Sequence, residues 1–374
     1  MSASAKLVLA DGTIYAGTSY AAPGAVFGNL IFDTTMTGYQ HSLTNPANVG
    51  TIMVFTFPHI GNVGVNDADA ESDQYWPAGV VVRDPARVRS NWQSERSLVE
   101  DLTTAGVVGI SGLDTRALTR HVRRSGQVAA GIFGGADAQA TDAELVAQVQ
   151  AWQQPSTSQL LEAVTTDEAY EVAADQPQAT VAVIDLGVRR ATITQLVQRG
   201  NTVKVMPAST TIEELTAANV DGVVFSSGPG NPAEATDQIS LAAALLETRM
   251  PVLGIGLGHQ IVAAALGYAS MLLPQAQRGP NQPVFDVASG QSIITNQNHH
   301  YAVDAPLGTH PAPNAGYGDV TVTQHSLNDH SVEALRAEEL PVLTVQYYPE
   351  NTALAIDEPH PVFDAFATLM ATGK

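Results

Sequence analysis

The chain has 374 residues, no cysteine, and 37 acidic against 17 basic side chains, for a formal net charge of −20. Its length predicts two domains, because one hydrophobic core rarely serves so long a chain. The lack of cysteine excludes disulfides, thiolate metal sites and cysteine nucleophiles, and the acidity argues against nucleic acid or an anionic membrane surface as a partner.

No targeting or membrane segment is expected. The start, MSASAKLVLADGT, has too short an apolar run for a secretory signal and predicts a first strand. Residues 250–273 carry no formal charge and are long enough to cross a bilayer. However, alternate glycines and a polar His-Gln pair interrupt this segment, so it predicts a buried strand, turn and helix. We therefore expect a cytoplasmic protein.

The first half of the chain is expected to be β-rich. Short apolar runs such as KLVLA, GNLIFDTT, GTIMVFTF and AGVVVRD alternate with Gly, Pro, Asn and Asp turn signals. Helices are predicted near 94–104 and 114–124, the second with Asp114 as its N-cap and an end before Gly126.

A change of composition predicts the domain boundary. From about residue 134 to 178 the sequence is rich in Ala, Gln and Thr, with weakly helical material followed by a polar connector. We predict an N-terminal domain over 1–150, a connector over 151–178 and a second domain over 179–374.

The second half alternates strands with helices. Strands are predicted at 180–186, 202–206, 221–227 and 251–255, and helices at 188–200, 211–218, 237–248 and 259–267. This alternation predicts an α/β domain with a mostly parallel sheet and helices on both faces. Ligand sites in such sheets lie beyond the carboxyl ends of the strands. The loops at 226–232, 256–260, 296–301 and 346–351 are therefore the expected site.

The segment PVLGIGLGHQ (251–260) has the pattern of a nucleophile elbow: a strand, three alternate glycines and a helix, in that order. Such a turn projects its apex side chain above the helix N-terminus, where the dipole and free N–H groups stabilise negative charge. The apex here is Gly256, which offers no nucleophile. Glycine tolerates positive φ, so the turn itself remains easy to form.

Two further loops carry candidate chemistry. SSGPGNP (226–232) exposes backbone N–H groups around Gly228 and Gly230, which either form a plain turn or bind an oxyanion. In QYYPE (346–350), Glu350 could orient a base two residues earlier. That position holds Tyr348, a phenol whose ordinary pKa of about 10 suits it poorly to act as a base near neutral pH.

Three histidines are the remaining polar candidates. Zinc accepts histidine and carboxylate ligands, which could come from His259, from either His299 or His300, and from Glu350. Adjacent histidines in a loop are more often solvated or hydrogen-bonded, so no metal site is predicted.

Motifs along both halves connect the sequence to a known family. The first half contains FGNLIFDTTMTGYQ (27–40), TFPHIGNVGVNDAD (56–69) and SGLDTRALTRHVR (111–123), and the second contains VIDLGVRR, SSGPGNP, GIGLGHQ, NQNHHYAVD and QYYPE in that order. With these blocks the sequence resembles, almost end to end, the small subunit of glutamine-dependent carbamoyl-phosphate synthase, a class I glutamine amidotransferase. The resemblance implies a β-rich α+β N-terminal domain followed by a glutamine amidotransferase-like α/β domain.

The resemblance also implies an activity and a partner. In the family a cysteine attacks the side-chain amide of glutamine, a histidine serves as base and acid, and a glutamate orients the histidine. Ammonia then moves through an internal channel to the large subunit, which makes carbamoyl phosphate from bicarbonate and two ATP. The implied partner is this large subunit, in a heterodimer. ATP and Mg would be bound there, so no cofactor is expected in this chain.

The catalytic positions depart from the family pattern. The family's G-I-C-L-G-H-Q places the nucleophile at Gly256, and its Q-G-H-P-E places the base at Tyr348 and the orienting glutamate at Glu350. Two family glycines become His300 and Tyr347, bulky side chains expected at or near the pocket. The resemblance assigns the remnant of the glutamine pocket to Ala47 (serine in the family), Gly228, Gly230, Leu257, Gln260, Asn298, His300 and Tyr301 (phenylalanine in the family).

Three functional hypotheses follow. The favoured one is a small subunit without glutaminase activity that still docks on the large subunit and supports ammonia-dependent carbamoyl phosphate synthesis, for arginine or pyrimidine formation. The alternative is a non-catalytic regulatory or ligand-binding paralogue whose pocket takes glutamine or another small metabolite. A third, less favoured, is hydrolysis by a replacement nucleophile, Ser226, Ser227 or Thr295, assisted by His259 or His300. The elbow, however, serves only its apex.

Overall fold

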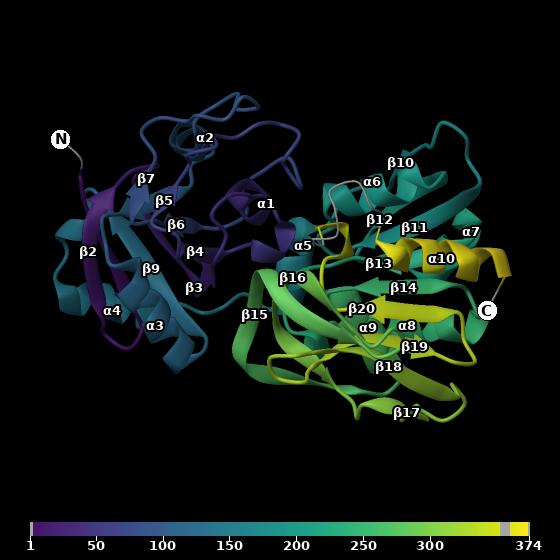
Figure 1. The fold of residues 1–374 in the computed structure, drawn as a ribbon. Coiled ribbons are helices and arrows are strands. Elements are labelled where there is room, and N and C mark those ends of the chain that lie inside the picture. Colours follow the sequence, from purple (N-terminus) through teal and green to yellow (C-terminus); the bar gives the residue numbers. More distant parts are fainter. Residues whose placement is uncertain (1–2, 352–359, 373–374) are drawn as a thin grey trace. The chain divides into compact units, whose positions relative to one another are not determined.

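The computed structural model describes residues 3–351 and 360–372 (Figure 1). The chain divides into two compact units, Met1–Pro155 and Ser156–Lys374. The division falls within the predicted connector, but the residues after it are structured. A helix, α5 (Thr157–Val164), and a strand, β10 (Tyr170–Val172), form there, and β10 pairs with β12 of the second unit.

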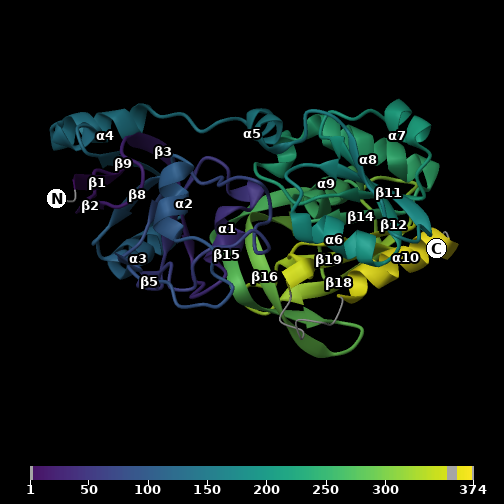
Figure 2. The ribbon, with the colours of Figure 1, turned by 90° about the horizontal axis from the view of Figure 1, so that it is seen from above.

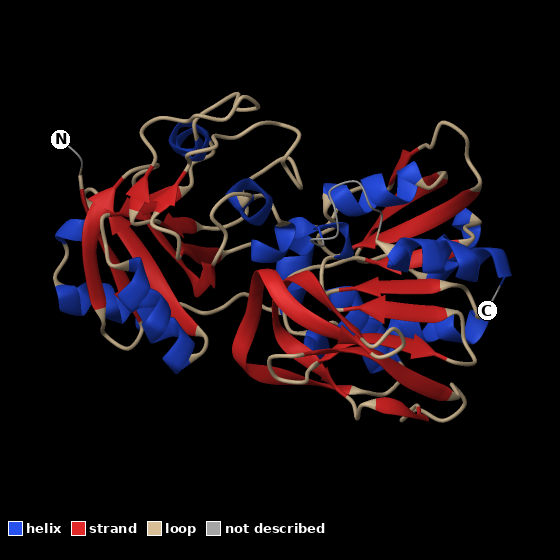
Figure 3. Cartoon of the chain, in the orientation of Figure 1, coloured by secondary structure: helices blue, strands red, loops and turns tan. Residues whose placement is uncertain are grey.

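The first unit is built around a closed β-barrel (Figures 1 and 3). Its strands follow the order β1-β2-β8-β6-β4-β3-β9, and β9 closes the barrel by pairing antiparallel with β1. The barrel strands are β1 (Ser4–Leu9), β2 (Ile14–Ser19), β3 (Ala25–Asp33), β4 (Thr51–Phe55), β6 (Gly79–Val81), β8 (Val108–Ser111) and β9 (Val128–Gly134). The remaining elements of this unit are α1 (Tyr39–Leu43), η1 (Pro46–Asn48), β5 (His59–Ile60), β7 (Asp84–Pro85), α2 (Leu98–Thr104), α3 (Thr115–Ser125), η2 (Asp137–Gln139) and α4 (Asp142–Ala151).

The predicted capping of α3 is confirmed. The Asp114 carboxylate accepts a hydrogen bond from the Ala117 backbone N–H at 2.9 Å, which satisfies one of the donors that a helix leaves free at its start. The helix ends at Gly126, whose φ of 73° lies in a region that favours glycine.

The described part of the second unit contains an 11-stranded sheet in the order β10-β12-β11-β13-β14-β20-β19-β18-β15-β16, with β17 paired to β18. Besides β10, its strands are β11 (Ala179–Asp185), β12 (Asn201–Pro207), β13 (Gly222–Phe225), β14 (Val252–Ile255), β15 (Ala269–Asp286), β16 (Gln291–Asp304), β17 (Gly308–Pro311), β18 (Asp319–Ser326), β19 (Val332–Ala337) and β20 (Val342–Val345). Its other helices are α6 (Arg190–Gln198), α7 (Ile212–Ala218), η3 (Pro232–Glu234), α8 (Thr236–Thr248), α9 (Leu257–Ala265), η4 (Pro349–Asn351) and α10 (Pro361–Thr372).

Helices cover both faces of this sheet, as the alternation of elements predicts. Side chains of a strand point alternately to its two faces, and β11 shows it. Ala182 and Ile184 join a core with α7, α8 and α9, while Val181 and Val183 join another with α6 and α10. Figure 2 shows the resulting layers, with α7 and α8 on one side of β11 and β12 and α10 on the other.

The parallel portion of the sheet is limited to β12, β11, β13, β14 and β20. Beyond β20 the sheet continues through antiparallel strands, including the long β15–β16 hairpin. The prediction of residues 296–301 as a loop is therefore wrong, because they lie inside β16 and pair with β15. Among the described helices, none combines the length and hydropathy that a bilayer span requires.

Candidate functional site

The elbow predicted at PVLGIGLGHQ is present in the backbone. Gly256 is the N-cap of α9, with φ 59° and ψ −112°, between the end of β14 and the start of the helix. Its N–H donates to the Val345 carbonyl at 2.9 Å, so the elbow lies beside the end of β20, the strand that leads to Tyr348 and Glu350. A side chain at the apex would stand at the N-terminus of a buried helix.

Packing explains the glycines on both sides of the apex. A Cβ on Gly258 would lie 2.1 Å from the Phe225 carbonyl oxygen, and one on Gly254 would lie 2.7 Å from the Gly258 carbonyl oxygen. Both contacts involve backbone, so only glycine lets α9 approach the sheet this closely. A Cβ on Gly256 would instead meet the Ser227 Cβ at 3.1 Å. The apex is therefore tight for a side chain but not closed to one.

Most of the proposed replacement nucleophiles are engaged in other bonds. The Ser226 hydroxyl accepts from the Leu186 N–H and donates to the Ser227 carbonyl, both at 2.9 Å. The Thr295 hydroxyl donates to the Gln282 carbonyl at 3.0 Å. Ser227 Oγ is buried and has no hydrogen-bond partner among the described residues. It lies beside the apex, yet no base is hydrogen-bonded to it.

The position of the catalytic base holds a buried phenol. The Arg189 guanidinium carbon lies 4.4 Å from the centre of the Tyr348 ring, a cation–π contact. Asn298 donates from Nδ2 to the Tyr348 hydroxyl at 3.1 Å. The ring is thus fixed from two sides, by a residue following β11 and by one in β16.

Glu350 is held by a cation and a hydroxyl. Its Oε2 lies 3.4 Å from Arg189 Nη1, and its Oε1 accepts a hydrogen bond from the Thr192 hydroxyl. Both Arg189 and the Glu350 side chain are buried. A buried arginine beside a buried carboxylate balances its charge. The carboxylate that the family uses to orient a histidine is here part of an ion pair.

Sequence reasoning missed Arg189, although its position carries a signal. It is the N-cap of α6 and follows the short turn after β11, at the carboxyl edge of the parallel strands where a ligand site is expected. The local turn is fixed by Asp185, whose Oδ1 accepts from the N–H groups of Gly187 and Val188 at 2.9 and 2.7 Å. Burial raises the pKa of the Asp185 carboxyl, while these backbone N–H donors act to lower it.

A second arginine, also missed, crosses the hairpin beside the site. Arg278 of β15 donates to Asn298 Oδ1 and, at 2.8 Å, to His300 Nε2. Burial first, and then the Arg278 charge, hold the pKa of His300 well below its ordinary value. His300 is therefore a neutral acceptor at physiological pH. The structure connects Tyr348, Asn298 and His300 in one polar network through Arg278.

The other predicted pocket residues are occupied by structural bonds. Gln260 Nε2 donates to the Tyr301 carbonyl at 2.6 Å and to Gln346 Oε1 at 2.8 Å. Leu257 opens α9 and is buried. A Cβ on Gly228 would lie 2.1 Å from the Leu186 carbonyl oxygen, and one on Gly230, with φ +107°, would lie 2.6 Å from the Thr157 side chain. Close packing therefore explains why these two positions hold glycine.

Ala47 belongs to the first unit. It lies in η1, where its N–H donates to the Asn45 side chain at 3.1 Å. The remaining predicted site residues belong to the second unit.

Tyr347 does not crowd the pocket as expected. Its hydroxyl donates to Gln324 Oε1 at 2.8 Å, and its ring packs edge-on against His360, with centres 5.5 Å apart. It joins the core on the α10 side of the sheet. Tyr347 and Tyr348 follow the end of β20, where the chain bends before η4, and their side chains have different neighbours.

The zinc ligands considered above have other partners. Glu350 faces Arg189, and His259 Nδ1 lies 2.7 Å from the Thr344 hydroxyl. Within the described ranges, no group of three or more His, Cys, Asp or Glu side chains could hold a metal ion.

Comparison with known proteins identifies first the class of the second unit and then the family of the whole chain. Residues 182–369 match the family model "Glutamine amidotransferase class-I", in agreement with the elbow and the sheet that carries it. Residues 7–132 match "Carbamoyl-phosphate synthase small chain, CPSase domain". The chain belongs to the carbamoyl phosphate synthase small chain family.

Curated relatives support this over the whole length. The carbamoyl phosphate synthase small chain of Streptomyces coelicolor is 45% identical over 367 residues, covering 98% of this chain and 96% of the relative. The Bifidobacterium longum protein of the same name is 43% identical over 383 residues, covering 98% and 94%. That of Corynebacterium diphtheriae is 40% identical over 374 residues, covering 99% and 98%.

Proposed function

We propose that this small chain of carbamoyl phosphate synthase has lost glutamine hydrolysis and supports ammonia-dependent synthesis by the large subunit. The observation that carries the proposal is the apex of the elbow. Gly256 keeps the backbone geometry of a nucleophile turn, with φ 59° and ψ −112°, and has no side chain to attack an amide.

The surroundings of the apex support the same conclusion. Tyr348 stands where the resemblance places the base, and its ring is fixed by Arg189 and Asn298. Glu350 is paired with Arg189 and hydrogen-bonded by Thr192. Covalent amide hydrolysis needs a nucleophile and a group that takes its proton. With both gone, any oxyanion stabilisation leaves a residual rate of roughly 10³–10⁴ over water.

The remaining role is association with the large subunit. The first unit matches the domain specific to this subunit, and its barrel is complete in the structure. The chain therefore retains the N-terminal domain that is specific to the family's small subunit, while its catalytic positions have changed. The complex would make carbamoyl phosphate for arginine or pyrimidine synthesis from free ammonia.

The test compares nitrogen donors. The chain is mixed with its large subunit, and carbamoyl phosphate is measured with bicarbonate, ATP and either ammonium or glutamine. We expect synthesis from ammonium and none from glutamine above the large subunit alone. A family small chain that carries Cys and His at the two catalytic positions serves as the control, active with both donors. Equal rates from the two donors with the present chain would contradict the proposal.

A second candidate is a regulatory or ligand-binding paralogue. The network of Arg278, Asn298 and His300 favours it, because two nitrogen donors of a buried arginine are directed to acceptors beside the former site. A rise in melting temperature with L-glutamine or L-glutamate, together with no binding to the large subunit, supports this candidate over the first.

A further inference from the structure

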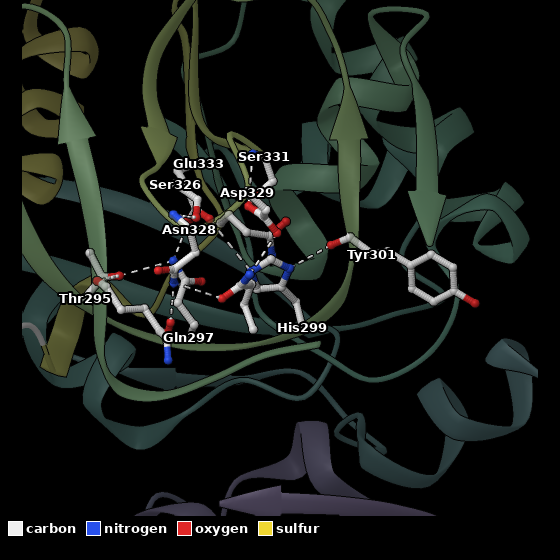
Figure 4. Close-up of polar contacts among 12 residues, drawn as sticks. Thr295, Gln297, His299, Tyr301, Ser326, Asn328, Asp329, Ser331 and Glu333 are labelled. Atoms are coloured by element: carbon white, nitrogen blue, oxygen red, sulfur yellow. Dashed lines mark hydrogen bonds and ion pairs between the residues drawn. The ribbon is translucent and has the colours of Figure 1, made fainter. Parts of the chain in front are cut away.

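A cluster of buried polar side chains lies on β16 and β19 (Figure 4). Gln297 and His299 are two residues apart on β16 and so share one face of the strand. Glu333 of β19 faces them, and all three side chains are buried. The cluster includes neither Gly256 nor Tyr348 nor Glu350, so its role is independent of the proposed loss of glutaminase.

His299 presents a lone pair to Glu333. Its Nδ1 lies 2.8 Å from the Tyr301 carbonyl oxygen, which can only accept, so Nδ1 carries the proton. Burial lowers the pKa of His299 to about 4, which keeps the ring neutral near pH 7. Nε2 is therefore an acceptor. It lies 3.9 Å from Glu333 Oε1, too far for a hydrogen bond.

The carboxyl group of Glu333 has one oxygen without a hydrogen-bond partner among the described residues, and the Ser331 hydroxyl is one of the hydrogen-bonding neighbours of the group. Its Oε2 accepts from Gln297 Nε2 at 2.5 Å. Within residues 3–351 and 360–372, Oε1 has no hydrogen-bond partner, and no lysine or arginine forms an ion pair with Glu333. Burial raises the pKa of this carboxyl to about 8. The group is therefore mostly protonated near pH 7, and a cation beside it would stabilise its ionised form.

Two further buried atoms without a hydrogen-bond partner among the described residues belong to the same part of the interior. Gln297 uses Nε2 for Glu333 and, at 3.1 Å, for the Thr295 hydroxyl, and its Oε1 has no partner among the described residues. His259 of α9 likewise has an Nε2 without a hydrogen-bond partner among the described residues, and burial first, then the nearby His299, lower its pKa to about 3. Within the described residues these atoms and the two that face each other, His299 Nε2 and Glu333 Oε1, have no hydrogen-bond partner.

We propose that this cluster binds one ammonium ion between His299 Nε2 and Glu333 Oε1. Ammonium supplies N–H donors to both atoms and a positive charge to the carboxylate. A guest between two atoms 3.9 Å apart can lie within about 2.9 Å of each, an ordinary hydrogen-bond length. Sodium and potassium suit the site less well, because hard cations prefer oxygen ligands to imidazole nitrogen.

Thermal unfolding of the full chain tests the site. The melting temperature is measured in ammonium, sodium and potassium chloride at equal ionic strength. We expect ammonium to raise it by about 2–4 °C over the other two salts, because a ligand that binds only the folded state stabilises it. Glu333→Gln keeps the shape, removes the charge and gives His299 an amide donor, so this variant should lose the response. Glu339→Gln, an exposed glutamate a few residues away, should retain it.

A second measurement does not depend on a variant. In ¹⁵N-edited NMR of the unaltered chain with ¹⁵N-ammonium, a buried ion gives a signal separate from bulk ammonium, and excess potassium leaves that signal in place. Identical melting temperatures in the three salts, together with no separate signal, would mean that water alone fills the site and would overturn the proposal. An equal response to potassium, or an unchanged response in Glu333→Gln, would overturn it as well.

Discussion

The glycines of the elbow should differ sharply in the cost of a methyl group. We compare Gly256→Ala at the apex, Gly258→Ala in the first turn of α9, and Gly290→Ala as a control. Gly290 has φ +68° with no atom within 4 Å of an added Cβ. It therefore reports only the backbone penalty of a positive φ, about 1–2 kcal/mol of unfolding free energy.

The magnitudes follow from the contacts. Gly256 has a φ similar to that of the control, but its ψ of −112° lies outside the left-handed helical region, and an added Cβ would lie 3.1 Å from the Ser227 Cβ. We expect a total loss of about 2–3 kcal/mol, since the neighbour must shift by a few tenths of an ångström. At Gly258 the added Cβ would lie 2.1 Å from the Phe225 carbonyl oxygen. Only moving α9 off β13 relieves that overlap, so the loss should exceed about 4 kcal/mol.

Urea unfolding followed by circular dichroism gives the three free energies, with thermal melts as an independent check. The order expected is Gly290→Ala, then Gly256→Ala, then Gly258→Ala. If Gly256→Ala proved as damaging as Gly258→Ala, the apex would not be a place for a side chain. The interpretation of this turn as a former nucleophile elbow would then fail.

Three further predictions concern the residues around the elbow and the buried acid. Gly256→Cys introduces the chain's only thiol at a helix N-terminus, so the pH profile of its alkylation by iodoacetamide should give a thiol pKa below the ordinary value of about 8.5. The control Gly290→Cys, in an exposed turn, should show the ordinary thiol pKa. The same pH profile for both variants would contradict the expected effect of the helix dipole. Arg189→Met should lower the free energy of unfolding by about 3–5 kcal/mol, because it leaves Glu350 buried without its cation. The loss should be smaller in the double variant that also carries Glu350→Gln. If the two losses measured by urea unfolding simply add, the two residues are not coupled. Unfolded Glu333 ionises near pH 4.5 and the folded carboxyl near 8, so the native state binds an extra proton between these values and its stability falls as pH rises. Without ammonium, the stability of Glu333→Gln relative to the unaltered chain should therefore increase by up to about 1.4 kcal/mol per pH unit over that range. A stability difference that stays constant with pH would refute the assignment.

The local features of the second unit could be predicted from sequence because neighbouring elements determine them. Predicted strands at 180–186 and 251–255 correspond to β11 and β14, and the helix at 211–218 to α7. The three alternate glycines also follow from short-range geometry, since a strand, a tight turn and a helix must pack closely. The elbow was therefore found with its apex at the right residue.

Pairing between distant segments could not be predicted in the same way. Residues 296–301 are polar and lack the β-branched run of a typical strand, yet pairing with β15 makes them part of β16. Arg189 and Arg278 carry the charges of the site, but their partners Glu350 and Asn298 are 161 and 20 residues away. The sequence shows where a charged residue stands, but it does not show which distant residue will pair with it in the fold.

The place of Tyr347 differs from the expected one, at or near the pocket. Strand β20 ends at Val345, and the bend that follows could not be predicted from the sequence pattern. The structure places Tyr347 in the core beside His360. Of the two substitutions, only Tyr348 bears on the proposed loss of glutaminase activity.

The most direct test follows the amide nitrogen of glutamine itself. The complex of this chain with its large subunit is given glutamine labelled with ¹⁵N in the amide together with unlabelled ammonium, and the carbamoyl phosphate formed is analysed by mass spectrometry. Because Gly256 offers no nucleophile, we predict product that contains only unlabelled nitrogen. Carbamoyl phosphate enriched in ¹⁵N, at a level above that of the large subunit alone, would show that the small chain still hydrolyses glutamine and would contradict the proposed loss of its catalytic site.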